Sequence, residues 1–490
     1  MAARSASGSL SACQTFSRGA GMRRSPVMSI GIPCTILRGA DVTCRVPGMQ
    51  PVPLPAPTLV EAVPFIGLLG SIALFPILAP RFWHRHLGAI ALFWSLVLLA
   101  PMVPHDGVSG AFAEAWHALL DEYLPFISLL FALYAGAGGI LIRGGPGGTP
   151  LTNTLWLAGG TLLASAIGTT GAAMVLIRPL LRANAHRTRK FHLVLFFILL
   201  VGNAGGMLSP LGDPPLYLGF LEGVPFFWPL RHLLAPLLVF SAPLLGAFWL
   251  IDRRSAAEAP AAPPARPLRL QGWGNLALIG MVVAGVLAQS AWQPGAIVLL
   301  GQPIAGEKLV TSLAFLVLGG LAALTTPRAV HEANLFEWEP IAEVAKLFPA
   351  IFITILPVLA LIAAGATGPL APLITLTARA DGTPSVPAYF WLTGIVGGFL
   401  DNAPTYLLFF RQAGIDAARL DGAPGDILRA ISAASVLFGG LTYIGNAPNM
   451  MIRAIAAHRG VRMPGFFGYL ARAGLALTPA LALVSVVFFG

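Results

Sequence analysis

Charged residues are scarce in this sequence of 490 residues. Asp, Glu, Lys and Arg together make up 10% of the chain, whereas hydrophobic residues make up 56%. A soluble globular domain carries about 25% charged residues, so the composition excludes a soluble protein. Mean hydropathy is +0.78, and several apolar runs are as long as a transmembrane helix requires. The sequence therefore predicts an all-α polytopic membrane protein.

Cysteines are also rare and lie in one place. Cys13, Cys34 and Cys44 all precede residue 49, so they cannot cross-link the apolar body or bind a metal within it. CxxC and HExxH patterns are absent, and His331-Glu332 lacks a second histidine four residues on. We therefore expect neither a disulfide-stabilised secreted fold nor a zinc hydrolase, and no cofactor.

The positive charge is distributed as in a membrane protein. The net charge of +10 could suit a nucleic-acid binder, but Lys and Arg lie in short loops between apolar segments. One set of loops holds 18 of these residues and the other set holds 6, while the remaining six lie in residues 1–57. By the positive-inside rule the first set faces the cytoplasm. We expect membrane lipid as a partner and no nucleic acid.

Ten segments are apolar enough to span a membrane, and two more are ambiguous. The stretches 151–181 and 387–411 have polar or Gly/Pro-rich centres and are too short to cross twice at about 20 residues per crossing. The charge distribution is consistent only if each enters and leaves on the same side. We therefore predict two re-entrant hairpins, the first from the cytoplasm and the second from outside. The predicted spans are 58–80, 87–104, 124–142, 191–220, 231–251, 273–292, 309–326, 347–367, 427–452 and 471–489.

Residues 1–57 differ in composition from the rest. The first 48 are rich in Arg, Ser and Gly and lack the apolar core of a secretory signal. Their arginines would fall on the outer side, against the positive-inside rule. We interpret this segment as a disordered tail or as the product of a mis-annotated start, with a targeting peptide as the alternative.

The two halves of the chain repeat each other. Ile167–Met174 resembles Phe399–Tyr406 at an offset of 232, and Leu208–Pro215 resembles Leu441–Pro448 at an offset of 233. By the charge count the halves run in opposite directions, which is typical of inverted repeats in secondary transporters. We predict a first repeat over 58–251, a cytoplasmic linker over 252–271 and a second repeat over 272–490.

A third repeated motif contains the prolines Pro125 and Pro349, at an offset of 224. Each is expected to open a span after an amphipathic segment, Glu114–Glu122 or Glu337–Lys346. We interpret these two segments as interfacial helices that brace the hairpins.

Each repeat contains two interruptions that a lipid-facing helix could not tolerate. They are Thr169–Ala172, Ser209–Pro215, Asp401–Thr405 and Thr442–Asn449. Proline removes a backbone donor, so such breaks persist only where they line a cavity. The residues expected to form the breaks and hairpin tips are Gly168, Gly171, Pro404, Gly212, Pro214, Gly445 and Pro448.

Two carboxylates, Asp213 and Asp401, fall inside these breaks. A charged carboxylate at mid-membrane costs ~3 kcal/mol or more, so each needs a partner or a function. One interpretation is a buried helix cap. The other is a site where H⁺ and a hard monovalent cation such as Na⁺ compete, with Asp213 and Asp401 as the metal ligands. The other expected ion-binding residues are Asn402, Asn446, Thr170, Ser209, Thr442 and Asn449.

Three motifs resemble the ion transporter superfamily, in particular its bacterial sodium/proton antiporter and citrate-permease branch. They are residues 202–215, 399–405 and 439–449, within a resemblance that covers about 58–490. The resemblance implies a multi-pass carrier of the bacterial inner membrane, often a homodimer, that moves by an elevator-like mechanism. It implies no enzymatic activity.

The sequence departs from the citrate-carrier pattern at the hairpin tips, which lack Ser-Asn-Thr. Asp401 would repel a citrate carboxylate, and no Arg or Lys lies in the four breaks to bind an anion. We therefore expect exchange of Na⁺ for H⁺, with cation-coupled uptake of citrate, a dicarboxylate or arsenite as the alternative.

Two intramembrane aspartates also suggest an intramembrane aspartyl protease. That family requires Gly-x-Gly-Asp, and Pro210 replaces the first glycine before Asp213. We keep this as a remote alternative. Histidines near cytoplasmic arginines, such as His84 and His86, are interpreted as interfacial.

Overall fold

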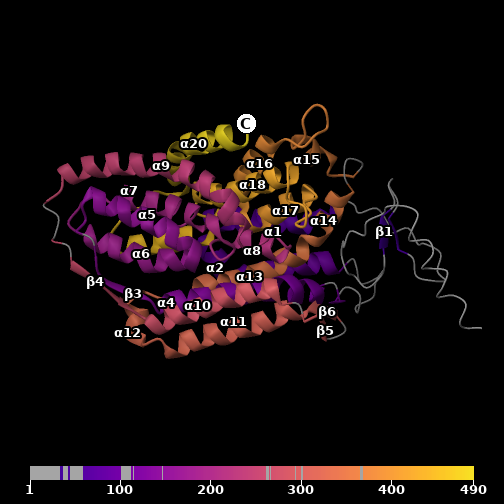
Figure 1. The fold of residues 1–490 in the computed structure, drawn as a ribbon, viewed down its shortest axis with the longest axis horizontal. Coiled ribbons are helices and arrows are strands. Elements are labelled where there is room, and N and C mark those ends of the chain that lie inside the picture. Colours follow the sequence, from indigo (N-terminus) through magenta and orange to yellow (C-terminus); the bar gives the residue numbers. More distant parts are fainter. Residues whose placement is uncertain are drawn as a thin grey trace, which may run out of the picture. The chain divides into compact units, whose positions relative to one another are not determined.

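The computed structural model describes residues 34–36, 42–44, 59–100, 112–113, 115–145, 147–260, 264, 266–292, 294–299, 302–364 and 368–490. Residues 57–490 form one compact unit of packed helices (Figure 1). In the described part of the chain, nine helices are long and apolar enough to cross a membrane. The protein is therefore an all-α, multi-pass membrane protein, as its composition predicts.

The unbroken helices expose apolar faces. Only 28% of the most apolar stretch of α10 and of α11 is buried, whereas 89% of the stretch Phe191–Leu208 is buried. Exposed leucines such as Leu324 and Leu475 would face acyl chains in a bilayer. The unbroken helices are α1 (Val63–Leu78), α2 (Pro80–Leu99), α4 (Leu124–Gly138), α9 (Trp228–Ala257), α10 (Trp273–Ala291), α11 (Gly306–Thr325), α13 (Glu339–Thr354), α14 (Leu356–Ala363) and α20 (Phe466–Phe488).

Both ambiguous stretches are helical hairpins. The first is α5 (Pro150–Ile167) with α6 (Thr169–Ala183), and the second is α16 (Val386–Leu400) with α17 (Asn402–Gln412). At the base of the first, the Asn153 and Asn184 side chains hydrogen-bond to each other at 2.9 and 3.0 Å. At the base of the second, Gln412 Nε2 donates to Thr377 Oγ1 at 2.7 Å, and the Thr377 carbonyl accepts from the N–H of Ser385, the residue before α16, at 2.8 Å. Both ends of each hairpin therefore lie together, as predicted.

A buried ionic network fixes the base of the first hairpin. Asp252, near the end of α9, accepts hydrogen bonds from Arg187 and Asn153 and is bonded to His192 at 2.7 Å. The side chains of Arg187 and Asp252 are 1% and 0% exposed. This network joins the hairpin to α9 and to the start of the next helix.

Two predicted spans, 191–220 and 427–452, are each broken at the centre. The first consists of α7 (Phe191–Leu200), the short helix η4 (Ala204–Leu208) and α8 (Pro214–Leu221). The second consists of α18 (Ala423–Leu437), η6 (Phe438–Leu441) and α19 (Ala447–His458). The breaks fall at the Pro-containing motifs, where the sequence predicts them.

The hairpin turns correct the alignment of the repeats by one residue. Gly168 and Asp401 each separate the two helices of a hairpin, with φ of 79° and 90°. Their offset is 233, the same as that of Asp213 and Asn446, which precede α8 and α19. The predicted offset of 232 was wrong. It pairs Gly168 with Leu400, but Leu400 is the last residue of α16 and the turn is at Asp401.

The prediction that separate helices precede Pro125 and Pro349 is also wrong. Residues Ala115–Gly138 form one span that passes through a π-helical turn, η3 (Leu119–Tyr123), and Pro349 lies inside α13. A proline inside a helix leaves a carbonyl one turn earlier without its donor. Here Lys308 Nζ donates to the Asp121 carbonyl at 3.3 Å, and the Tyr123 hydroxyl donates to the Ala345 carbonyl at 2.9 Å. These side chains allow both helices to continue.

The predicted linker 252–271 contains the end of a helix and a strand. Helix α9 continues to Ala257, and β4 (Arg266–Gln271) pairs antiparallel with β3 (Leu141–Gly145). The other elements are η2 (Leu59–Ala62), the hairpin of β5 (Ala296–Leu299) and β6 (Gln302–Ala305), α12 (Arg328–Ala333) and α15 (Ala371–Leu376). The predicted tail 1–57 lies outside the described residues, apart from the antiparallel pair β1 (Cys34–Ile36) and β2 (Val42–Cys44).

Candidate ion-binding site

The buried carboxylate of Asp213 is the centre of the site. Its side chain is 1% exposed. Thr169 Oγ1 donates to Oδ1 at 3.1 Å, Asn446 Nδ2 donates to Oδ1 at 2.8 Å, and Asn402 Nδ2 donates to Oδ2 at 2.6 Å. These donors come from α6, from the break before α19 and from α17. Both repeats therefore contribute side chains to one carboxylate.

The four residues occupy equivalent positions at helix starts. Thr169 and Asn402 are the first residues of α6 and α17, and Asp213 and Asn446 directly precede α8 and α19. The N-terminus of a helix carries a partial positive charge. Four such ends meet around Asp213, and they stabilise a negative charge at that point.

Asp213 does not cap its own helix. No side-chain bond joins it to the first turn of α8, and its two oxygens accept from residues of other elements instead. Asp401, by contrast, accepts from the backbone N–H of Ala403 at 3.4 Å and so caps α17. Asp401 therefore fits the cap interpretation as well as the ion-site interpretation, whereas Asp213 makes no cap bond. The carboxylate of Asp213 is buried and held by residues of the other three breaks, and Asp401 lies at a hairpin tip.

One acceptor in the site has no partner. Asn402 is fully buried, and its Nδ2 is bonded to Asp213, but its Oδ1 has no hydrogen bond among the described residues. A buried amide oxygen without a donor costs free energy. An amide oxygen near a carboxylate can coordinate a hard cation such as Na⁺, or it can accept a hydrogen bond from a protonated group.

A second layer of amides, Asn203 and Asn449, holds the first in place, and the sequence analysis did not single out Asn203. Asn203, in the break after α7, donates to Asn449 Oδ1 at 2.8 Å and accepts from Asn446 Nδ2 at 3.1 Å. Asn449 in turn donates to the carbonyls of Gly439 and Thr442 at 2.7 and 2.9 Å. Asn449, expected as a ligand, therefore positions Asn446 through Asn203. The signal for Asn203 was a lone amide in a long apolar run.

Ser209 and Thr442 brace the breaks against the hairpins. The Ser209 hydroxyl donates to the Ser165 carbonyl, and the Thr442 hydroxyl donates to the Gly398 carbonyl at 2.6 Å. Each hydroxyl also accepts from a backbone N–H two residues on. Both pairs are related by the offset of 233. The two hydroxyls were expected as ion ligands, but their bonds are to the backbone and not to Asp213.

The remaining predicted residues shape the backbone of the site. Thr170 makes no side-chain bond in the described structure, and its neighbour Thr169 contacts Asp213 instead. A Cβ at Gly212 or Gly445 would overlap or crowd neighbouring carbonyl oxygens, so both positions require glycine. The other break and tip residues start helices or pack beneath them: Gly168, Gly171, Pro214, Pro404 and Pro448.

The geometry does not match an aspartyl protease. In such an enzyme two carboxylates share a proton. Among the described residues no hydrogen bond joins Asp213 and Asp401, and the Asp213 oxygens are bonded to a threonine and two asparagines. Nor does any described Arg, Lys or His side chain bond to Asp213. The site therefore consists of one carboxylate surrounded by a hydroxyl and two amide donors.

The comparisons with known proteins agree with a transport site. Residues 56–489 match the family model described as "Putative citrate transport". The match spans both repeats and all four breaks. A search of curated proteins gave no match. The resemblance inferred from the motifs is thus confirmed for a transporter family, whereas the sodium/proton antiporter branch stays a prediction.

Proposed function

The chain belongs to the "putative citrate transport" family, and we propose that it is a secondary transporter that exchanges Na⁺ for H⁺ at Asp213. The observation that carries this proposal is the position of the carboxylate. It is fully buried and receives one threonine and two asparagine donors from both repeats, with no basic side chain as a counter-ion among the described residues.

The chemistry follows from the cost of a buried charge. An ionised carboxylate inside a membrane costs ~3 kcal/mol or more, and either a proton or a bound cation neutralises it. The two cannot occupy the same oxygens at once. Competition between them couples the flux of one to the counter-flux of the other. Asp401, at the second hairpin tip, is proposed as the other carboxylate on this path.

The proposed motion is elevator-like, with the hairpins, the broken helices and α9 moving past helices such as α10 and α11. Helix α9 belongs to the moving part because the Asp252 network joins it to the first hairpin. An open surface pocket of about 610 Å³ marks the boundary between the two parts, lined by Phe220 and Trp228 at the end of α8 and start of α9 and by residues of α10 and α11 such as Gln289 and Lys308. Space at such a boundary allows one part to slide past the other. We propose a homodimer in a bacterial inner membrane as the working form.

Coupled citrate uptake is the second candidate, and two observations favour it. The first is the family description. The second is the meeting of four helix N-termini, since such ends attract anions. Against it, the carboxylate of Asp213 already lies in that positive field and would repel a carboxylate substrate. We therefore place Na⁺/H⁺ exchange first.

The test is proton movement in proteoliposomes that contain the purified full-length chain. A Na⁺ pulse is expected to drive protons across the membrane in the native protein, and Asp213→Asn is expected to abolish this response. Asp421→Asn removes an exposed carboxylate outside the breaks and is the matched control, which should remain fully active. The double variant Asp213→Asn/Asn446→Asp moves the acid to the equivalent position and should regain part of the activity.

The same vesicles distinguish the two candidates. Li⁺, K⁺, arsenite and radiolabelled citrate are supplied in turn. Accumulation of citrate above the level of empty vesicles, with no response to Na⁺ alone, would establish the second candidate and reject the first.

A further inference from the structure

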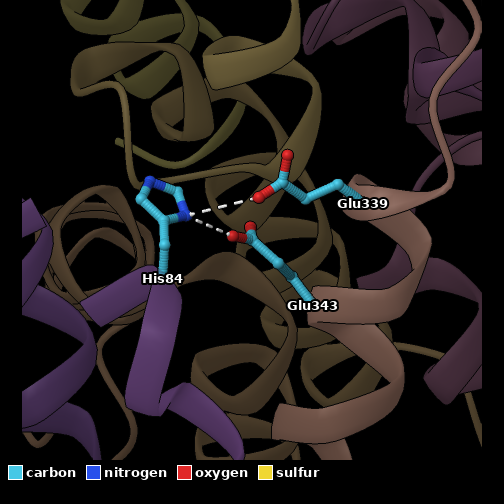
Figure 2. A group of neighbouring side chains, drawn as sticks. All are labelled: His84, Glu339 and Glu343. Atoms are coloured by element: carbon cyan, nitrogen blue, oxygen red, sulfur yellow. Dashed lines mark hydrogen bonds and ion pairs between the residues drawn. The ribbon is translucent and has the colours of Figure 1, made fainter. Parts of the chain in front are cut away.

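A cluster of three ionisable side chains lies far in sequence from the Asp213 site. Figure 2 shows His84 of α2 facing Glu339 and Glu343 of α13. His84 Nδ1 is 2.8 Å from Glu343 Oε1 and 3.8 Å from Glu339 Oε1. One potential ligand atom from each residue lies within 4.8 Å of the others. The three side chains therefore converge on one point between two helices.

The packing of α2 on α13 holds this arrangement. Further along the pair, Gly88 lies against the aliphatic part of Lys346, where a Cβ would meet the Lys346 side chain at 3.7 Å. The two glutamates are four residues apart, so they share one face of α13, and like charges at this spacing destabilise a helix. Among the described residues neither carboxylate has a hydrogen bond or ion pair with a group other than His84.

Nearby basic residues do not neutralise the pair. Arg81, Arg85 and Lys346 belong to the same two helices, but none forms an ion pair with Glu339 or Glu343 in the described structure. The cluster thus combines two carboxylates with one imidazole and has no paired Arg or Lys among the described residues. This set of ligand atoms, one nitrogen and two carboxylates, is that of a cation site.

We propose that His84, Glu339 and Glu343 bind a divalent first-row transition metal ion. An imidazole nitrogen with two carboxylates suits Mn²⁺, Fe²⁺, Co²⁺ or Zn²⁺, whereas Ca²⁺ and Mg²⁺ prefer oxygen ligands alone. Ligands about 2.1 Å from a metal are about 3.4 Å apart in tetrahedral geometry and about 3.0 Å apart in octahedral geometry, and the distances of 2.8 and 3.8 Å lie on either side of both values.

The remaining coordination positions are open to water. The side chains of His84, Glu339 and Glu343 are 50%, 64% and 33% exposed. The bound ion would tie α2 to α13, two helices that carry none of the four breaks. The site is thus separate from the proposed ion path, and its occupancy is measurable without transport.

The experiment is a titration of the purified full-length protein with Mn²⁺, followed by electron paramagnetic resonance. Mn²⁺ is the probe because the cysteine thiolates at 13, 34 and 44 favour softer metals. The native protein is expected to bind one Mn²⁺ per chain at this site and to show coupling of the metal to a histidine nitrogen. His84→Gln should lower the affinity at least tenfold and remove the nitrogen coupling.

Matched variants remove a similar group outside the cluster. His86→Gln removes a histidine from the same helix, and Glu332→Gln removes an exposed glutamate from α12. Both should bind Mn²⁺ like the native protein. Glu339→Gln/Glu343→Gln should fail to bind but should fold, because it removes two like charges four residues apart on α13. A melting midpoint without metal at or above that of the native protein would confirm this. The proposal is overturned if His84→Gln binds Mn²⁺ with native affinity, or if the native protein binds no more than the double variant.

Discussion

Replacing Asp401 with glycine separates the conformational cost of this residue from its role in transport. Asp401 has φ 90° and ψ 136°, and the equivalent residue of the first hairpin is Gly168 with φ 79° and ψ 150°. This backbone region strongly favours glycine, and a non-glycine residue there costs about 1–3 kcal/mol. Asp401→Gly relieves that strain.

Asp401→Gly also removes the helix cap, but the stability lost with the cap is small. The cap bond to Ala403 is long, at 3.4 Å, and replacing an N-cap residue by glycine costs only a few tenths of a kcal/mol. We therefore expect Asp401→Gly to be more stable than the native protein by roughly 1–2 kcal/mol, whereas Asp401→Ala keeps the strained backbone, loses the cap and should be less stable by about 1 kcal/mol.

Thermal unfolding of the detergent-solubilised protein measures the effect on stability. Na⁺-driven proton movement in proteoliposomes measures the effect on transport. We expect the glycine variant to melt above the native protein, by an amount of the order of 2 °C, and to lose transport. If the glycine variant melts at or below the alanine variant, the strain argument is refuted. If it is stabilised and fully active, Asp401 has no part in the ion path.

Three further variants test the packing around the site. Arg187→Met leaves the buried carboxylate of Asp252 without its cation and should lower the free energy of unfolding by about 3–5 kcal/mol, seen as a lower melting midpoint. Asn203→Ala removes a donor and an acceptor from the amide layer and should cost about 1–3 kcal/mol together with a weaker apparent affinity for Na⁺; a native affinity would contradict the positioning role. Gly212→Ala should prevent folding because its Cβ would overlap a backbone carbonyl oxygen, whereas Gly246→Ala, which has open space, should be neutral by the same melting assay.

The sequence predicted the fold well because the membrane imposes simple rules on it. Apolar length located nine of the ten predicted spans among the described residues, and the tenth, 427–452, is too interrupted to qualify. The Gly/Pro motifs located the breaks of the two interrupted spans, since a backbone without its helical bonds is tolerated only inside the protein. In the hairpins, however, Thr169–Ala172 and residues 402–405 are helical, and the turns are the single residues Gly168 and Asp401. The predictions that failed concern the ends of individual helices. The prolines at 125 and 349 were expected to begin helices, yet Tyr123 and Lys308 supply the missing donors. Those donors are 222 and 187 residues away from their acceptors, and no local pattern records them.

The site was predicted in composition but not in detail. Asp213, Asn402 and Asn446 were chosen correctly as neighbours, because equivalent positions in inverted repeats meet at the pseudo-twofold axis. The one-residue error in the first motif pair led to Thr170 in place of Thr169. A hydroxyl in a break can point to an ion or to the backbone, and the sequence does not tell which. For Ser209 and Thr442 the backbone carbonyls of the hairpins are the partners.

The central claim is that Asp213 holds either a proton or Na⁺, never both. Calorimetric titration of the solubilised protein with Na⁺, in two buffers that differ in ionisation enthalpy, gives the number of protons released for each Na⁺ bound. The account predicts proton release on Na⁺ binding by the native protein and by Asp421→Asn, and none by Asp213→Asn. Na⁺ binding without proton release, or release that persists in Asp213→Asn, would contradict it.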